Sequence, residues 1–331
     1  MTTIFEGKNI LVTGGTGSIG SAIVRKVVQY HPGVVRVFSN DENGLFNLGQ
    51  ELREHEIVRF LLGDVRDKER LQRAMEGIHF VFHAAALKHV AACEYNPFEA
   101  VKTNVLGTQN LIETAMQEEV DKLVTISTDK AVNPTNVMGA TKLLAERLTT
   151  SASQYVGLRK TIFSCVRFGN VLDSRGSVIP IFKEQIGRGG PVTITDPDMT
   201  RFVMSIPRAV ELVLKATEMA QGSEIFILKM RALRIGDLAE VMIADMAPRY
   251  GYDPKAIEVR TTGKREGEKN HEELLTEDEA ASAYEEEDMF TIVPADRNLR
   301  GKRTVARRYT SRDGHLLTRS EIREMLAANA F

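Results

Sequence analysis

The segment Asn9-Ile10-Leu11-Val12-Thr13-Gly14-Gly15-Thr16-Gly17-Ser18-Ile19-Gly20 joins a short apolar run to a glycine-rich turn. Apolar residues recur with helical spacing just after it, and a second apolar run follows. The pattern predicts a strand over residues 8–13, a helix over residues 21–30 and a strand over residues 34–38. Glycines in this strand, turn, helix, strand order are typical of a turn that binds a dinucleotide.

In such a turn the glycines let the backbone approach the pyrophosphate, and the first amides of the helix face its charge. The predicted contacts are Gly14, Thr16, Gly17, Ser18, Ile19 and Gly20. The second strand ends in Ser39-Asn40-Asp41-Glu42, where the adenosine ribose should be read. An acidic side chain favours a free 2′-hydroxyl, so Asn40 and Asp41 predict NAD. NADP stays open, because Arg66 could reach a 2′-phosphate.

Two more strands are predicted, over residues 58–62 and 79–83, with a helix over residues 68–76 between them. Asp64 follows the first of these strands, next to Val65. We expect Asp64 to hydrogen-bond the amino group of the adenine.

Small residues follow the second of these strands, at Ala84, Ala85 and Ala86. They would let the backbone approach the cofactor, although tight helix packing alone would also place small residues here. Lys88 and His89 come next, in a segment that could face the substrate. His89 could as well be a surface or supporting imidazole.

The densest group of polar side chains spans residues 127–142, which read Ser-Thr-Asp-Lys-Ala-Val-Asn-Pro-Thr-Asn-Val-Met-Gly-Ala-Thr-Lys. The group follows a short apolar run, so it should begin at the carboxyl end of a buried strand. Ligands of open α/β sheets bind outside the carboxyl ends of the strands. We therefore expect Asp129 and Lys130 at the rim of a ligand-binding crevice.

Two helices are predicted to flank these polar residues. One covers residues 97–117 and carries Asn104 on its mostly apolar face, where an amide needs an internal partner. Asn104 could fix the loop beneath the polar group. The other helix begins near Asn136 and places Met138 and Lys142 one turn apart on the same face.

The second half of the chain does not alternate regularly between strand and helix. Three arginines at predicted loop positions, Arg175, Arg201 and Arg265, would suit bidentate binding of one dianionic ligand, although surface arginines would look the same singly. The remaining elements are a strand over residues 161–167, a helix-led region from residue 173, a turn-rich loop over residues 193–201, a helix over residues 206–220, a strand over residues 225–228, a helix over residues 235–250 and a charged turn over residues 264–269.

Composition excludes several classes of protein. A formal net charge of -2 gives no reason to expect a nucleic-acid or membrane partner, and the basic tail over residues 297–312 reads as a solvated face or subunit contact. Cys93 and Cys165 lack the spacing of a disulfide framework or a metal site, so both should be small buried residues and no metal is expected. No apolar run approaches the roughly 20 residues of a bilayer span, so a cytoplasmic protein is expected.

The glycine turn, His83-Ala84-Ala85-Ala86-Leu87-Lys88-His89-Val90 and Ser127-Thr128-Asp129-Lys130 together resemble the extended short-chain dehydrogenase/reductases. Within them, residues 133–142 resemble the UDP-N-acetylglucosamine 4,6-dehydratase group, which makes sugars for surface polysaccharides and glycoproteins. The resemblance covers roughly residues 5–295. It implies an α/β fold, a Rossmann-type doubly wound parallel sheet with a smaller α/β carboxyl-terminal lobe that holds the substrate.

The resemblance also implies a division of the chain. Residues 1–167 would form the dinucleotide-binding domain, and residues 168–331 mainly the UDP-sugar lobe and tail, with later segments returning to the first domain. Contacts to uridine or diphosphate carry over to Asn170, Arg175, Arg201, Arg265 and Glu268. Some relatives carry membrane-spanning segments ahead of this unit, whereas this chain looks like a free-standing version and, like its relatives, a homo-oligomer.

One residue departs from the wider superfamily, because Met138 stands where most members carry a catalytic tyrosine. A thioether cannot exchange a proton near neutral pH. The proton of the sugar 4-hydroxyl must therefore go to another group, and Thr128 could hydrogen-bond that hydroxyl.

The resemblance suggests the following hypothesis for the reaction. C4 of UDP-N-acetylglucosamine is oxidised, the C5 proton and the C6 hydroxyl leave as water, and the hydride returns to C6. Lys130 would be the C5 base, Asp129 the acid for the C6 oxygen, and Lys142 would orient the nicotinamide ribose. We expect Lys142 and the oxidised nicotinamide to lower the pKa of Lys130 by like-charge repulsion.

Two other functions fit parts of this pattern. A UDP-sugar 4-epimerase shares the hydride step but needs neither a C5 base nor a C6 acid, so Asp129 and Lys130 argue against it. A non-catalytic cofactor-binding protein would explain the missing tyrosine, and would bind NAD without turning over any UDP-hexose.

Overall fold

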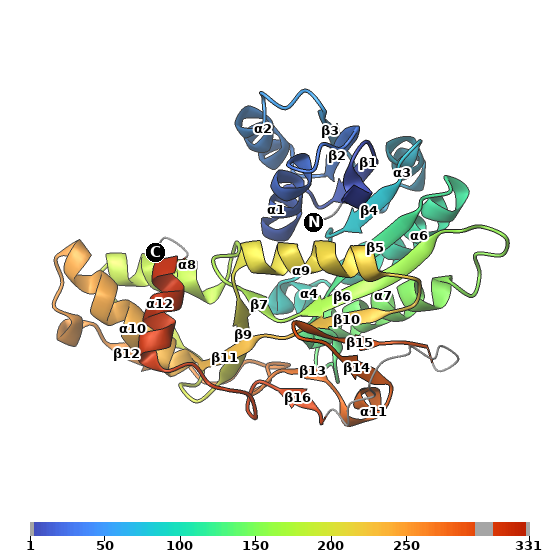
Figure 1. The fold of residues 1–331 in the computed structure, drawn as a ribbon. Coiled ribbons are helices and arrows are strands. Elements are labelled where there is room, and N and C mark those ends of the chain that lie inside the picture. The colour runs from blue at the N-terminus through green and yellow to red at the C-terminus, as the bar shows by residue number, and fades with distance from the viewer. Residues whose placement is uncertain (1–2, 295–306, 329–331) are drawn as a thin grey trace.

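The computed structural model describes residues 3–294 and 307–328 of the 331-residue chain. Its largest unit is a nine-stranded sheet in the order β14-β15-β10-β6-β5-β4-β1-β2-β3 (Figure 1). Seven strands from β10 to β3 are parallel, and β15 and β14 add an antiparallel edge. The strands are β1 (Asn9–Thr13), β2 (Val34–Ser39), β3 (Val58–Leu62), β4 (Phe80–His83), β5 (Lys122–Thr128), β6 (Ile162–Phe168), β10 (Ile225–Leu228), β14 (Ala283–Glu285) and β15 (Met289–Ile292).

Helices cover both faces of this sheet, because each strand is buried on two sides and crossover helices alternate between them. One core lies between the sheet and the helices α1 (Ser18–Val28), α2 (Glu42–Glu51) and α9 (Ile206–Met219). The other core lies beneath α3 (Lys68–Met75), α6 (Gly107–Gln117) and α7 (Val137–Ala152). The prediction of a doubly wound parallel sheet is therefore confirmed.

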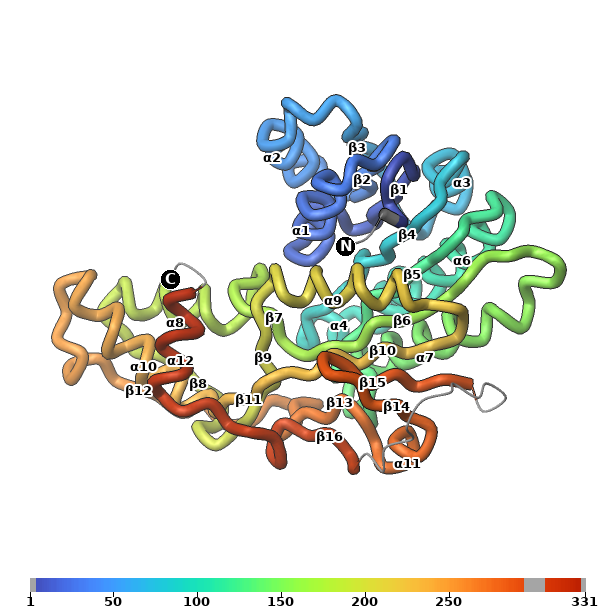
Figure 2. The backbone as a smooth tube through the Cα atoms, viewed as in Figure 1, coloured from blue at the N-terminus to red at the C-terminus, as the bar shows by residue number. Residues whose placement is uncertain are grey.

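A third core lies to one side of the sheet and is built around α8 (Val178–Gly187), α10 (Ile235–Met246) and α12 (Arg319–Ala328). A three-stranded sheet lies between this helical group and the large sheet (Figure 2), and the other short strands form two-stranded pairs. These strands are β7 (Asn170–Val171), β9 (Thr200–Met204) and β11 (Arg231–Arg234) in one sheet, β8 (Val192–Ile194) with β12 (Val259–Thr261), and β13 (Glu273–Leu275) with β16 (Tyr309–Thr310).

Four local predictions are wrong. No helix is predicted between the strands over residues 34–38 and 58–62, but α2 begins at Glu42, directly after Asp41. The helix over residues 97–117 is divided into α5 (Pro97–Val101), a π-helical turn (Lys102–Leu106) and α6. The loop over residues 193–201 includes parts of β8 and β9, and only its centre at Pro197 turns. The helix predicted to residue 250 ends at Met246, because Pro248 cannot donate a helical hydrogen bond.

Other expectations concern the termini and single residues. The predicted basic tail over residues 297–312 lies outside the described residues as far as residue 306. Cys93 and Cys165 are free and buried, as predicted. Within residues 3–294 and 307–328, no helix is long and apolar enough to cross a bilayer.

Candidate active site

The glycine turn is packed so closely against neighbouring backbone that it has no room for side chains. A Cβ atom on Gly14, whose φ is +63°, would lie 2.6 Å from the backbone nitrogen of Ala85. A Cβ atom on Gly20 would lie 2.2 Å from the carbonyl oxygen of Gly14. Helix α1 begins at Ser18, and its N-cap Gly17 offers no side chain to the first amides. These amides can therefore bind an anion, and the turn fits a dinucleotide pyrophosphate.

The turn lies at the point where the strand order reverses, because β1 has β2 on one side and β4 on the other. The amide of Ala84 donates to the carbonyl of Thr13, so the predicted alanine run lies against the glycine turn. Thr16 is buried and its hydroxyl bonds Ser39, while Ile19 packs on the core. The side chains of Thr16 and Ile19 are thus used within the protein, so any contact of these two residues with a cofactor would be made by their backbone atoms.

At the adenosine end, Asp41 caps α2 by accepting from the amide of Gly44. Asp64 accepts a two-point hydrogen bond from Arg66, which together with a bond from Asn40 lowers the pKa of Asp64. The guanidinium of Arg66 also bonds a second carboxylate, that of Glu99, at 2.8 Å. Because Arg66 is paired with two carboxylates, it is not free to bind a 2′-phosphate, which favours NAD over NADP. Val65, next to Arg66, is buried.

His83 was not identified from the sequence, and it lies fully inside the protein at the end of β4. Its Nδ1 is 2.8 Å from the hydroxyl of Thr13, and its Nε2 is 3.0 Å from the hydroxyl of Thr108. Thr108 donates to the carbonyl of Asn104, so Nε2 of His83 must carry the hydrogen and Nδ1 must accept. Burial, with a smaller effect of Lys142, lowers the pKa of His83 to about 3. The ring is therefore neutral at any physiological pH.

The predicted internal partner of Asn104 is present. Asn104 lies in the π-helical turn, accepts from the amide of Leu87 at 2.8 Å and donates to the carbonyl of Leu87 at 3.0 Å. It also donates to the hydroxyl of Thr141, next to Lys142 on α7. π-helical turns occur often at functional sites, and this one joins the loop after β4 to the helix that carries Lys142.

Asp129 and Lys130 follow β5 directly, in a short 3-10 turn (Asp129–Ala131) at the predicted crevice edge. Asp129 is fully buried, and its Oδ1 accepts from the hydroxyl of Thr128 and from Nζ of Lys130, both at 2.9 Å. Its Oδ2 is buried without a hydrogen-bond partner among the described residues. A Cβ atom on Gly169 would come within 3.0 Å of Oδ2. Asp129 and Lys130 thus share one hydrogen bond, and Oδ2 of Asp129 remains able to accept another.

The charge state of Lys130 differs from the prediction. Burial disfavours its ammonium form, but Asp129 and Glu272 outweigh this effect and raise the pKa of Lys130. The cation that opposes them is Arg201 rather than Lys142. The expectation that Lys142 lowers the pKa of Lys130 is therefore wrong, because Lys142 points instead to the end of β5.

Lys142 and Met138 both point inward from α7. Nζ of Lys142 donates to the carbonyl of Ile126 at 2.7 Å, and burial lowers the pKa of Lys142. Because an ammonium has three donors, Lys142 retains capacity to bond ribose hydroxyls. Met138 packs in a small apolar cluster with Cys93 and Ala100, so its thioether contributes packing.

The sequence reasoning also missed Glu272, which reaches Lys130 from the segment ahead of β13. Its Oε1 lies 3.6 Å from Nζ of Lys130 and 3.9 Å from Nε of Arg201. Arg201, predicted in a loop, lies in β9, is 8% exposed and also pairs with Glu268. Lys269 approaches the same acids and donates to the carbonyl of Val132. No local pattern in the sequence indicates this arrangement.

The remaining predicted substrate residues fall into two places. Asn170 and Arg265 belong with the Lys130 cluster, since Oδ1 of Asn170 is 3.5 Å from Nζ of Lys130 and the amide of Arg265 bonds Glu268. The loop around Arg175 crosses to the cofactor turn instead.

In that loop the amide of Arg175 donates to the hydroxyl of Ser18, and its guanidinium is 3.3 Å from Asp41. Nζ of Lys88 donates to the carbonyl of Arg175. The ring of His89 lies so close to Gly176 that a Cβ atom there would come within 2.6 Å of Cε1. The three predicted arginines therefore do not form one cluster.

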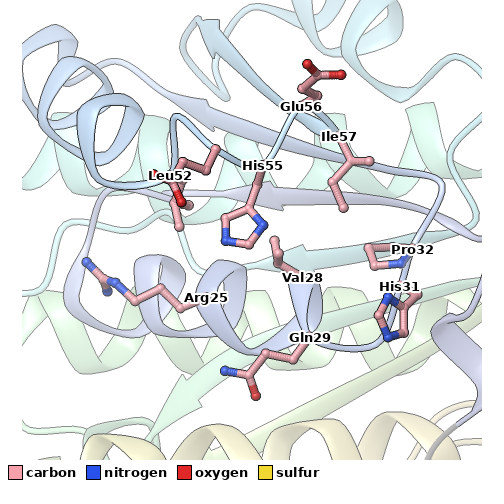
Figure 3. Close-up of a pocket in the computed structure, with 10 residues that line it drawn as sticks. Arg25, Val28, Gln29, His31, Pro32, Leu52, His55, Glu56 and Ile57 are labelled. Atoms are coloured by element: carbon pink, nitrogen blue, oxygen red, sulfur yellow. The ribbon is translucent and has the colours of Figure 1, made fainter.

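A cavity of about 720 Å³ lies elsewhere in the molecule (Figure 3). It is lined by residues that precede β2 and β3, including His31, Pro32, His55 and Ile57. These loops lie at the amino ends of parallel strands, whereas ligands of such sheets bind at the carboxyl ends. The cavity is thus separate from the candidate active site.

A family model described as "Polysaccharide biosynthesis protein" matches residues 10–294. A protein of Methanocaldococcus jannaschii, named as an uncharacterized membrane protein, is 59% identical over 98% of this chain and 97% of its own length. A UDP-N-acetylglucosamine 4,6-dehydratase (inverting) of Campylobacter jejuni is 42% identical over 88% of this chain and 84% of its own length. A UDP-glucose 4-epimerase of Rickettsia rickettsii is 38% identical over 98% and 96% of the two chains.

Solved structures agree with these relatives. The structure of Pen from Bacillus thuringiensis matches with a TM-score of 0.92 and 45% identity over 99% of both chains. The NAD complex of UDP-glucose 4-epimerase from Thermus thermophilus matches with a TM-score of 0.65 and 26% identity, over 78% of this chain and 88% of that one.

Proposed function

Because the chain belongs to the polysaccharide biosynthesis protein family, we propose that it is an NAD-dependent UDP-N-acetylglucosamine 4,6-dehydratase. The product would be a UDP-4-keto-6-deoxy-N-acetylhexosamine for surface polysaccharide or glycan synthesis. At the level of the family, the chain is an enzyme related to nucleotide-sugar dehydratases and epimerases. Its cofactor is NAD, which is also bound in the Thermus thermophilus complex. The observation that carries the dehydratase proposal is the hydrogen-bonded pair of Asp129 and Lys130 at the carboxyl end of β5.

When bound, NAD supplies reversible hydride storage, taking a hydride from C4 of the sugar and giving it back at C6. The glycine turn and the amides of α1 would hold its pyrophosphate, and Lys142 its ribose. Arg201, Glu268, Asn170 and the segment of Arg265 would hold the UDP group, as their position around Lys130 supports.

Thr128 offers a route for the proton that a tyrosine would take in other members. Its hydroxyl donates to Asp129, so a sugar 4-hydroxyl can donate to the same oxygen of Thr128. As C4 is oxidised, the 4-hydroxyl proton would pass to Thr128 while the hydrogen of Thr128 passes to Asp129. Asp129 is then protonated, which is the form needed to donate to the departing C6 oxygen.

Lys130 would remove the C5 proton, which the new 4-carbonyl acidifies. The C6 oxygen then leaves as water with the proton from Asp129. After the hydride has returned to C6, Lys130 would return a proton to C5. The protons lost from the 4-hydroxyl and C5 balance those gained by the water and C5.

Asp129→Asn tests the role of the acid. An amide can neither accept the relayed proton nor donate one to the C6 oxygen, so dehydration should fall by about 100- to 10,000-fold. NADH absorbance in a single turnover should also appear more slowly, because the relay has lost its acceptor. Asp121→Asn, at an exposed surface pair, is the matched control. Full dehydratase activity in Asp129→Asn would refute the assignment.

A UDP-hexose 4-epimerase is the second candidate, and the Rickettsia rickettsii relative supports it. Incubation with NAD and UDP-N-acetylglucosamine, followed by mass spectrometry and NMR of the product, separates the two functions. A dehydratase product is lighter by one water, and an epimerase product has the mass of the substrate. An unchanged mass with inversion at C4 would overturn the dehydratase proposal.

A further inference from the structure

We propose that Glu272 takes a proton from Lys130 before the C5 step and returns it afterwards. This inference rests on the proposed dehydratase function, and it concerns how an ammonium group in the resting site becomes a base. Because Glu272 acts through Lys130 and not on the substrate, it is a positioning residue.

Lys130 needs such an acceptor because its neighbours hold it in the charged form. Two carboxylates and three cations face its amine from four separate segments of the chain. These groups are Asp129 on the same turn, Glu272 and Lys269 ahead of β13, Arg201 on β9 and Lys88 in the loop after β4. The acids dominate, so the pKa of Lys130 lies above its ordinary value. A base role requires that this proton move first.

Glu272 has the position and the capacity to accept that proton. Its Oε1 is 3.6 Å from Nζ of Lys130, and its side chain is 4% exposed. Its Oε2 is buried without a hydrogen-bond partner among the described residues. The buried carboxylate of Glu272 therefore lies close to the amine of Lys130 and has one oxygen that is free to accept a hydrogen.

The timing follows from the relay to Asp129. While Asp129 is ionised, it holds the ammonium of Lys130 through the 2.9 Å hydrogen bond. Once Asp129 has received the 4-hydroxyl proton, Lys130 loses its strongest anionic partner. An N–H bond of Lys130 then breaks, an O–H bond forms on Glu272, and the free amine takes the C5 proton. After C5 is protonated again, the proton on Glu272 returns to Lys130, and the cycle closes with no net proton gained or lost.

Glu272→Gln tests this inference through its pH profile. Gln cannot take the proton, so dehydration at neutral pH should fall by about 100-fold and should recover as the pH rises, because solvent hydroxide then deprotonates Lys130. The wild-type rate should vary less over the same range. The KM for the UDP-sugar should change little, and Glu272→Asp should restore part of the rate. Glu273→Gln is the matched control, since that carboxylate bonds Asn133 instead.

Two outcomes would overturn the inference. A loss of activity that is the same at every pH would mean a purely structural role. A higher rate at neutral pH would mean that Glu272 only suppresses the free amine by its charge.

A second measurement does not require turnover, so it distinguishes this inference from the proposed function. Acetylation of Lys130 by acetic anhydride, followed by peptide mass spectrometry across pH, reports its free amine directly. The labelling curve of Glu272→Gln should differ from that of the wild type, whereas that of Glu273→Gln should not. Identical labelling curves would show that Glu272 and Lys130 are not coupled. If labelling shifts while no UDP-sugar is dehydrated, the proposed function fails and the coupling stands.

Discussion

Replacing Lys130 by arginine is expected to lower dehydration by about 100- to 10,000-fold, the contribution of a general base. Arginine keeps the positive charge beside Asp129, so the buried acid remains paired, but a guanidinium does not lose its proton in proteins. Lys130→Ala would test the same role less cleanly, because it would leave Asp129 buried without its cation. If Lys130 served only as an ion-pair partner, arginine would preserve activity.

The measurement is the uptake of deuterium from solvent at C5 of the product, together with the overall rate. Both should fall in Lys130→Arg, whereas Lys183→Arg, an exposed position on α8, should behave as the wild type. Undiminished exchange and turnover in Lys130→Arg would remove Lys130 from the base role.

Replacing Arg167 by methionine is expected to cost about 3–5 kcal/mol of folding stability, as for other broken buried ion pairs. The guanidinium of Arg167 is 1% exposed and makes two hydrogen bonds to the equally buried Glu146, at 3.0 and 2.8 Å. It also bonds Glu279 and the carbonyl of Leu274. Methionine fills part of the volume but leaves the charge of Glu146 without a partner.

Urea unfolding monitored by circular dichroism measures this loss. Arg147→Met removes an exposed guanidinium on α7, the helix that carries Glu146, and should cost less than about 1 kcal/mol. Adding Glu146→Met to Arg167→Met should recover much of the stability, because the unpaired charge is then gone. A single variant as stable as the wild type, or a double variant no better than the single, would contradict this account.

The parts of the fold that the sequence predicted are those set by neighbouring residues. The strand before the glycine turn, the helix after it and the start of α7 near Asn136 depend on patterns a few residues long, and all three are present. Helix α2 was missed although Asp41 caps it and Leu45 and Leu48 face the core. The acidic residues at the end of β2 indicate a ribose-binding segment, and the helical spacing of the leucines that follow them is short.

The electrostatics of the site were less predictable because they depend on residues far apart in the chain. Asp129 and Lys130 were recognised from their place after a buried strand. Glu272, which changes the behaviour of Lys130, approaches from more than a hundred positions later, and no local pattern reports that approach. The same holds for Arg175, which a loop of the second half places beside Asp41.

The antiparallel edge of the large sheet and the Glu272 segment have a consequence for synthesis of the chain. The glycine turn, His83 and Lys130 leave the ribosome early, whereas Glu268, Glu272 and the partner Glu279 of Arg167 leave only when most of the chain has been made. The nascent chain therefore contains the glycine turn long before it contains all the residues of the proposed proton transfer. The proposed activity requires residues from the last third of the chain, and pairing across such a separation is expected to make that final step the slow one in folding.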